Sequence, residues 1–306
     1  MPTSDQLIEQ ILKTIDEAVT SFNSSIPQTQ KKAFAKVVEM LNDLDKSNGK
    51  VKITVKNLKI IRAIRQELES IIVSKEYKNK VELFEIAFDE VEDLNKKYFS
   101  KIATEFDPRT LFDEIKINTI ESVKENLLLT GIKANVVNKL SDILNQNITS
   151  GARFEDLTDQ VRIFLTDTKE GDGALVRYAK TYTTDALNQY NAQYTATATD
   201  DLGLEWYKYV GSLLTTSRPF CKSLIEAKKQ GMEYIHRSQF KNLLKGDING
   251  KQIGINEKTD LPYGMIAGTN EFNLTVNRGG YGCGHQLMPV SSAIVPKALR
   301  DKFENK

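Results

Sequence analysis

Apolar residues recur at helical spacing through the first half of the chain. In residues 7–22 they fall three or four positions apart, behind Thr3 and Ser4, which can cap a helix. The same spacing predicts helices over residues 30–44, 55–72, 77–106, 110–129 and 134–145. Asp107 and Pro108 end the longest of these, because proline disfavours the helical conformation in the residue before it. Apolar faces this long and wide predict a helical bundle or a contact with another chain.

The pattern becomes mixed after Gly151. It predicts helices over residues 154–164, 175–198 and 238–244, and another that begins near Pro219, a residue suited to a first helical turn. Residues 204–210 alternate in the manner of a strand, and residues 285–290 predict a second short strand. The turn around Asn249 and Gly250 predicts a hairpin. Residues 256–273 show no periodicity, so we expect a loop there.

Glycine is distributed unevenly between the two halves. Gly49 and Gly131 lie within residues 1–150, and the other 15 of the 17 glycines follow. Because glycine destabilises helices and favours turns, we predict an α+β protein that is predominantly α. Residues 1–150 are expected to form a helical bundle or arm that provides partner contacts. Residues 151–306 are expected to form a smaller α+β domain.

The overall composition is that of a soluble protein. It has 40% hydrophobic and 27% charged residues and a formal net charge of +1. This charge is too small for the whole surface to bind nucleic acid without specificity. The first residues lack the pattern of a secretory signal, and no run of about eighteen apolar residues occurs. We therefore expect a protein that works inside a cell or within a larger particle, without a membrane contact.

All the cysteines and histidines lie in the last third of the chain: Cys221, His236, Cys283 and His285. Cys221 follows the predicted start of a helix, where the positive end of the dipole favours a thiolate. Cys283 and His285 are two residues apart in a glycine-rich turn. The three residues Cys221, Cys283 and His285 offer three of the four usual zinc ligands, with His236 as a candidate fourth. A Cys221–Cys283 disulfide, and two buried thiols beside a hydrogen-bonded histidine, are open alternatives.

Four motifs follow one another in the second half of the chain. They contain Arg177 and Thr181 in a helix, Trp206 in a strand, Arg218 and Pro219 before Cys221, and Arg278, Gly279, Gly280 and Tyr281 before Cys283 and His285. This ordered set resembles the Mu F-type head morphogenesis domain of tailed bacteriophages, a family that includes minor head proteins found near the portal. The resemblance covers roughly residues 173–291. It departs from the family at Gly282 and Gly284, where relatives commonly carry asparagine and arginine, and in residues 212–215, which lack an aspartate.

The resemblance implies a non-enzymatic structural protein of the virion. Such a protein would bind the portal or capsid proteins in the head, take part in head assembly in the host cytoplasm, and could leave with the DNA. It implies neither a small-molecule substrate nor a membrane partner. Arg218 and Arg278 are expected to orient carbonyl groups or to stabilise a thiolate, with two surface arginines as the alternative.

An enzymatic alternative uses the same residues. Cys221 at a helix start with His285 as its base would form the nucleophile pair of a cysteine-dependent hydrolase or a toxin-like enzyme, with Asn277 or Asp260 to orient the histidine. The sequence surroundings of known cysteine hydrolases are absent, however, and Cys283 would have no role. We therefore expect no catalytic residues.

A second alternative is contact with packaged DNA through a basic stripe. The stripe consists of Lys52, Lys56, Lys59, Arg62 and Arg65, which largely recur every third residue beside the apolar face of a predicted helix. A solvated helix face is the alternative, and the acidic residues 82–93 could neutralise the stripe within the bundle. The tyrosines of residues 175–198 and Trp206 are expected to be core residues rather than a base-stacking platform.

Overall fold

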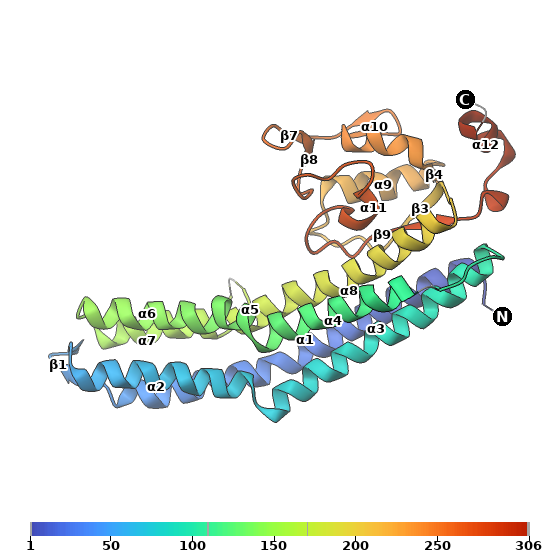
Figure 1. Cartoon of the computed structure of the whole chain (residues 1–306). Coiled ribbons are helices and arrows are strands. Elements are labelled where there is room, and N and C mark those ends of the chain that lie inside the picture. Colours follow the sequence, from blue (N-terminus) through green and yellow to red (C-terminus); the bar gives the residue numbers. More distant parts are fainter. Residues whose placement is uncertain (1, 109, 170, 305–306) are drawn as a thin grey trace. The chain divides into compact units, whose positions relative to one another are not determined.

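The computed structural model describes residues 2–108, 110–169 and 171–304. Helices make up 66% of it and strands 9%, so the predicted, predominantly α fold with a small α+β part is confirmed. The long helices of Figure 1 are α1 (Ser4–Asn42), α2 (Val55–Ile72), α3 (Lys75–Ile102), α4 (Thr110–Leu128), α6 (Asn138–Thr149), α7 (Phe154–Leu165) and α8 (Ala174–Asp201). The short helix α5 (Thr130–Ile132) and a π-helical turn (Lys133–Val137) lead directly into α6.

Tertiary contacts divide the chain into two compact units. Unit 1 comprises Met1–Asp16, Ala87–Thr119 and Thr184–Lys306, and unit 2 comprises Glu17–Ile86 and Ile120–Thr183. The boundary expected at residue 150 lies within unit 2, so these units do not coincide with the two regions expected from the sequence. The physical reason is that α1, α3, α4 and α8 each contribute residues to both units.

Helix α1 is one continuous helix where two were predicted. Pro27 lies inside it, although a proline removes one backbone hydrogen bond and costs about 3 kcal/mol in a helix interior. The buried face nevertheless continues across this position, because Ile26, Thr29 and Gln30 are all buried. Burial of this face therefore outweighs the local penalty, and the predicted break between residues 22 and 30 is wrong.

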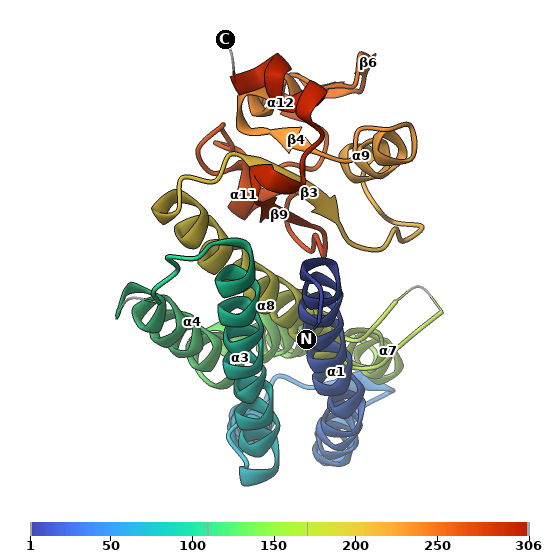
Figure 2. The ribbon, with the colours of Figure 1, turned by 90° about the vertical axis from the view of Figure 1, so that its right-hand side faces the viewer.

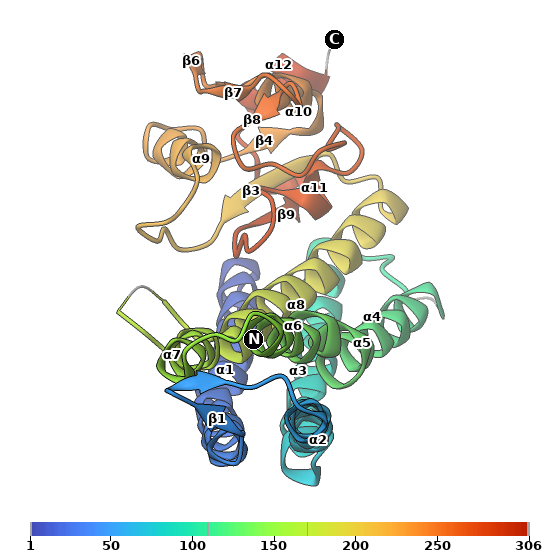
Figure 3. The same cartoon turned by 90° about the vertical axis from the view of Figure 1, so that its left-hand side faces the viewer.

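Unit 2 contains a β-hairpin that joins α1 to α2. Its strands are β1 (Lys46–Ser47) and β2 (Lys50–Val51), which lie beside the first turn of α7 in Figure 3. Helix α2 begins after Thr54, whose side chain accepts a hydrogen bond from the N–H of Asn57. Its buried face is Ile61, Ile64 and Leu68, at the predicted spacing, and it packs against α6.

Unit 1 contains a three-stranded antiparallel sheet in the order β4-β3-β9, shown in Figure 2. The strands are β3 (Trp206–Val210), β4 (Ile235–His236) and β9 (Gln286–Val290), and the two predicted strands are thereby confirmed. The surrounding elements are α9 (Pro219–Lys229), a 3-10 turn (Arg237–Gln239), α10 (Phe240–Leu244), β5 (Asp247–Ile248), β6 (Lys251–Gln252), β7 (Ile255–Asn256), β8 (Leu261–Pro262), α11 (Leu274–Asn277), a 3-10 turn (Ser292–Ile294) and α12 (Lys297–Glu304).

The turns of unit 1 follow the sequence with one exception. The hairpin of β5 and β6 is confirmed, and Asn249 and Gly250 both have positive φ angles, 53° and 78°, as a type I′ turn requires. The expected loop over residues 256–273 instead begins with a short ladder, since Asn256 pairs with Leu261. Two-residue strands carry too little alternation to be read from sequence.

Trp206, Tyr190 and Tyr194 lie in the core, as expected, whereas Tyr178 and Tyr182 on α8 are only half-buried. Trp206 is buried and contacts Phe303 edge to face, with ring centroids 5.6 Å apart. On α8, Tyr190 and Tyr194 are fully buried among aromatic neighbours. A base-stacking role for them is therefore excluded, because their rings are not accessible.

Candidate metal centre

The first candidate ligand, Cys221, is positioned by the start of α9. Pro219 occupies the first turn of this helix, where its fixed φ angle favours helix formation and its missing N–H costs nothing. Cys221 follows in the same turn, as the sequence predicted. Phe220 is fully buried and its ring meets Tyr209 edge to face, which anchors this turn against β3.

The second and third candidate ligands, Cys283 and His285, are positioned by a glycine turn between α11 and β9. Gly280 has a φ angle of 100°, and a Cβ there would lie 2.0 Å from the carbonyl oxygen of Gly264. At Gly279 a Cβ would lie 2.5 Å from the sulfur of Cys221 and 3.1 Å from that of Cys283. The absence of these two side chains allows the turn to approach both sulfurs. The Gly279-Gly280 pair is therefore part of the site.

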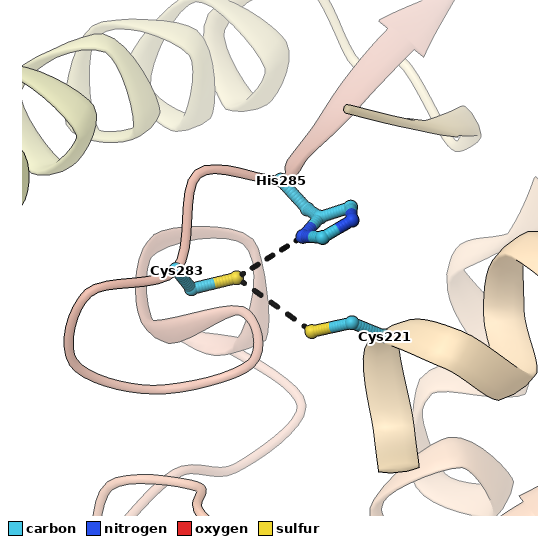
Figure 4. Close-up of side chains that lie close together, drawn as sticks. All are labelled: Cys221, Cys283 and His285. Atoms are coloured by element: carbon cyan, nitrogen blue, oxygen red, sulfur yellow. Dashed lines mark hydrogen bonds between the residues drawn. The ribbon is translucent and has the colours of Figure 1, made fainter. Parts of the chain in front are cut away.

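The three predicted ligands meet in one buried cluster, shown in Figure 4. The sulfurs of Cys221 and Cys283 are 3.8 Å apart, and the Cys283 sulfur is 3.8 Å from Nδ1 of His285. All three donor atoms lie within 4.8 Å of one another, and the residues are only 2%, 3% and 4% exposed. The sulfurs are too far apart for a disulfide, whose bond is about 2.05 Å long, and both cysteines are free.

This geometry fits a tetrahedral metal site. Two sulfurs each about 2.3 Å from one ion at the tetrahedral angle lie about 3.8 Å apart, and a sulfur and a nitrogen about 3.6 Å apart. The distances from the Cys283 sulfur to its two partners, both 3.8 Å, are close to these values, and the third pair lies within 4.8 Å. Two sulfurs and an imidazole are also a donor set that zinc and related ions prefer. The cluster could therefore hold a metal ion.

The two cysteines share their charge unequally. The pKa of Cys283 is lowered, chiefly by its hydrogen bond with Cys221, with further help from His285 and the charge of Arg278. The same hydrogen bond, together with burial, raises the pKa of Cys221. Without a metal, the pair therefore shares one proton and one negative charge, and the charge is favoured on Cys283.

Arg278 is a buried arginine beside this thiolate. It is 1% exposed, and its guanidinium donates to the carbonyl oxygen of Asn188 at 2.6 Å and to the Oε1 atom of Gln286 at 3.4 Å. Burial lowers its pKa, and the charge of Cys283 opposes this change. Arg218 is half-buried and donates to the carbonyl oxygen of Tyr281. Both arginines thus donate hydrogen bonds to carbonyl groups, as expected if they orient these groups rather than lie free on the surface.

Several residues of the site were not identified from the sequence. The ring of Tyr209 stacks on His285 with centroids 5.3 Å apart, and burial raises its pKa. The hydroxyl of Tyr209 and Nε2 of His285 are buried without a hydrogen-bond partner among the described residues. Asp185 accepts a hydrogen bond from the N–H of Gly282, and burial raises its pKa. The sequence carries no distinct sign of Asp185 and Asn188, because other buried residues of α8, such as Thr183 and Asn191, are polar as well.

His236 is not part of the cluster. Its ring nitrogens contact the Ser238 hydroxyl at 2.8 Å and the Glu205 carboxylate at 3.3 Å. His236 pairs with Trp206, the first residue of β3. His285 instead comes just before Gln286, which pairs with Val210, the last residue of β3. Four strand residues separate these ends by about 13 Å. The expectation that His236 could be the fourth ligand is therefore corrected.

The remaining motif residues lie apart from the ligands. Arg177 is exposed in unit 2, and its carbonyl oxygen accepts a hydrogen bond from Thr181. Tyr281 is exposed on the glycine turn. Two cavities, of about 210 and 270 Å³, are lined by other residues, so neither opens onto Cys221, Cys283 or His285.

The basic stripe is exposed as a whole. Lys52, Lys56, Lys59, Arg62 and Arg65 all reach solvent on α2 or just before it. The acidic residues 82–93 do not neutralise it in the described part of the chain. Their ion pairs are made instead with Lys96, Lys116 and Lys124.

Comparison of the chain with family models, curated proteins and solved structures found no match. Among the described residues, no helix combines the length and apolar character needed to cross a bilayer.

Proposed function

We propose that this chain is a non-enzymatic minor head protein of a tailed bacteriophage, and that Cys221, Cys283 and His285 bind zinc to close its C-terminal module. It would act on the portal or the inner capsid during head assembly in the host cytoplasm and remain in the virion. One observation carries the proposal: residues of separate motifs that resemble the Mu F-type domain converge on a single buried centre. Such convergence is expected if the motifs belong to one structural site.

Zinc is favoured over the two alternatives for this cluster. A disulfide would require the two sulfurs to approach by almost 2 Å from their 3.8 Å separation. A hydrolase would need an accessible nucleophile, yet Cys221 is 2% exposed and its pKa is raised. His285 also directs Nδ1 to Cys283 rather than acting as the base of Cys221. The two cavities found do not adjoin these residues, and a buried ligand set of this kind is typical of structural zinc sites.

Bound zinc would stabilise the module by joining α9 to the glycine turn. Cys221 and Cys283 are 62 residues apart in the chain and belong to the same core cluster of buried residues. Structural zinc sites contribute folding free energy directly. Zinc would add to this core a link that fixes the loops, which suits a protein that acts through its surface.

The zinc part is tested by metal analysis of the purified full-length protein. We expect about one zinc ion per chain. The variants Cys221→Ser and Cys283→Ser should lose it, and Met288→Leu, a buried sulfur-containing residue outside the cluster, should keep it. A native protein that contains no zinc and cannot be loaded with it would contradict this part of the proposal.

The virion part is tested in particles produced by the phage genome that encodes the chain. Mass spectrometry of purified particles should detect the protein at low copy number together with the portal. Deletion of its gene should reduce the yield of filled, infectious heads. If complete heads in normal particle preparations lack the protein, the assignment as a minor head protein is wrong. This conclusion would hold whether or not the purified chain contains zinc.

A further inference from the structure

The chain contains a long segment with positive charges and no negative ones. Between Asp45 and Glu67 there is neither an aspartate nor a glutamate, although the chain as a whole has 41 acidic and 42 basic residues. The segment carries the cations Lys46, Lys50, Lys52, Lys56, Lys59, Arg62 and Arg65. A local excess of this kind, in a nearly neutral protein, concentrates positive potential on one surface.

The cations are carried by a rigidly positioned platform. The buried side chain of Asn57 accepts a hydrogen bond from the N–H of Asp45 at 2.8 Å and donates to the carbonyl oxygens of Asp45 and Lys52 at 3.0 and 2.8 Å. These bonds fix the hairpin of β1 and β2 on the first turn of α2. The lysines of the hairpin and the cations of the helix therefore keep a constant relative position within unit 2.

Most of the positive charge on α2 is available to a partner. Lys56 pairs with Asp45 at 2.7 Å and Arg65 with Glu69 at 3.2 Å, but both pairs are exposed and so contribute little. Lys59 and Arg62 make no ion pair with any described residue. They lie on the side of α2 opposite its buried isoleucines, so their charges face solvent.

We propose that this face of α2, with its adjoining hairpin, binds the phosphate backbone of duplex DNA without sequence specificity. From Lys56 to Arg65 the helix rises about 13.5 Å, a length over which duplex DNA carries about eight charges. Residues 46–66 contain no aromatic side chain, so they offer no platform for unstacked bases of a single strand. The proposal goes beyond the proposed head function and does not depend on it.

An acidic protein is the competing partner, and the composition of the face argues against it. Protein interfaces are anchored by aromatic and arginine residues in desolvated pockets. Here the exposed apolar residues are Ile53 and Val55 at the edge of the stripe, at 64% and 71% exposure, without an adjoining cavity among those found. Evenly spaced cations on a rigid helix suit a regular row of phosphates better.

The experiment measures binding of the full-length protein to a fluorescent 30-base-pair duplex by anisotropy, between 50 and 200 mM salt. If the four cations of α2 contact phosphates, the affinity should fall about 150-fold over this range. The variant Lys59→Gln with Arg62→Gln should bind more weakly and lose only about 12-fold, since two contacts remain. Thermal melting should be unchanged, because both side chains are exposed and unpaired.

A matched control removes the same charge elsewhere in unit 2. Lys75→Gln with Lys78→Gln has the same three-residue spacing on an exposed helix face and should bind DNA as the native chain does. Equal losses in the two double variants would overturn the proposal, because net charge alone would then explain binding. The proposal would also be overturned if the native chain bound polyglutamate but not the duplex at 50 mM salt. A third contrary result would be that Ile53→Ser with Val55→Ser loses DNA binding while Lys59→Gln with Arg62→Gln keeps it.

Discussion

Gly279, which lies against the sulfurs of Cys221 and Cys283, provides a test of the geometry of the cluster. In Gly279→Ala, the new methyl group would lie 2.5 Å from the sulfur of Cys221 and 3.1 Å from that of Cys283. Carbon and larger atoms pack at about 3.5–4.0 Å, so the first contact is about 1 Å too short. The φ angle of Gly279 lies outside the positive range, and the effect therefore comes from this contact rather than from backbone strain.

The cost of the contact should appear mainly in metal affinity. Overpacking of this kind costs about 1–3 kcal/mol, and the atoms that must move are two of the three ligands. Every 1.4 kcal/mol is about a tenfold change in affinity, so we expect zinc binding about 5- to 140-fold weaker, measured by competition with a chromophoric chelator. Thermal melting of the zinc-loaded protein should fall by several degrees.

Gly284→Ala is the matched control for this substitution. Gly284 lies between Cys283 and His285, yet a Cβ there would meet no atom within 4 Å and its φ angle is not positive. Its zinc affinity and melting temperature should remain close to the native values. If Gly279→Ala binds zinc as tightly as Gly284→Ala does, the packing of the glycine turn against the sulfurs is not as described here, and the tetrahedral site loses its main geometric support.

Three further predictions concern the surroundings of the site and the platform of α2. In the metal-free protein, the pKa of Cys283 is lower in the folded chain than in the unfolded chain, so its contribution to stability should grow as the pH rises towards the unfolded thiol's pKa of about 9. The pKa of Cys221 is raised on folding, so stability should decrease above about 9, and urea unfolding across this range checks both. Asn57→Ala should lower the free energy of unfolding by about 2–4 kcal/mol, because it leaves buried backbone groups without hydrogen bonds. As a control, substitution of the exposed Asn79 by alanine should change the free energy of unfolding by less than about 0.5 kcal/mol. His236→Ala should lower the melting temperature but retain the full zinc content. Loss of zinc from this variant would show that His236 is a ligand after all.

The parts of the fold that depend on local periodicity were predictable from the sequence. Helix α2 has the predicted bounds, residues 55–72, because its apolar spacing, its Thr54 cap and its length agree. The break expected around Pro27 does not occur, since burial on both sides maintains the helix and burial is not visible in a local window. The division into two units could not be predicted from the sequence either, because it arises from contacts between segments far apart in the chain.

Site residues could be predicted from the sequence where their chemistry alone identifies them. They could not be predicted where their position depends on the register between strands. Cys221, Cys283 and His285 were identified because few residues of their kind exist in the chain. His236 has the same chemistry as His285, but the pairing of Trp206 with His236 places it at the far end of β3. Tyr209, which stacks on His285, likewise becomes a site residue only through the register that pairs it with Leu287.

The arginines beside the cluster balance the charges of the metal-free cysteine pair. Arg278 is 1% exposed and cannot lose its proton, so its charge needs compensation close by. With one proton shared between the cysteines, one thiolate and the carboxylate of Asp185 balance Arg278 and the half-buried Arg218, whose charge acts on both Asp185 and Cys221. A doubly charged ion that displaces the shared proton would add one positive charge to this neutral centre. A metal ion here would therefore have to be held by the spacing and chemistry of its donor atoms rather than by charge balance.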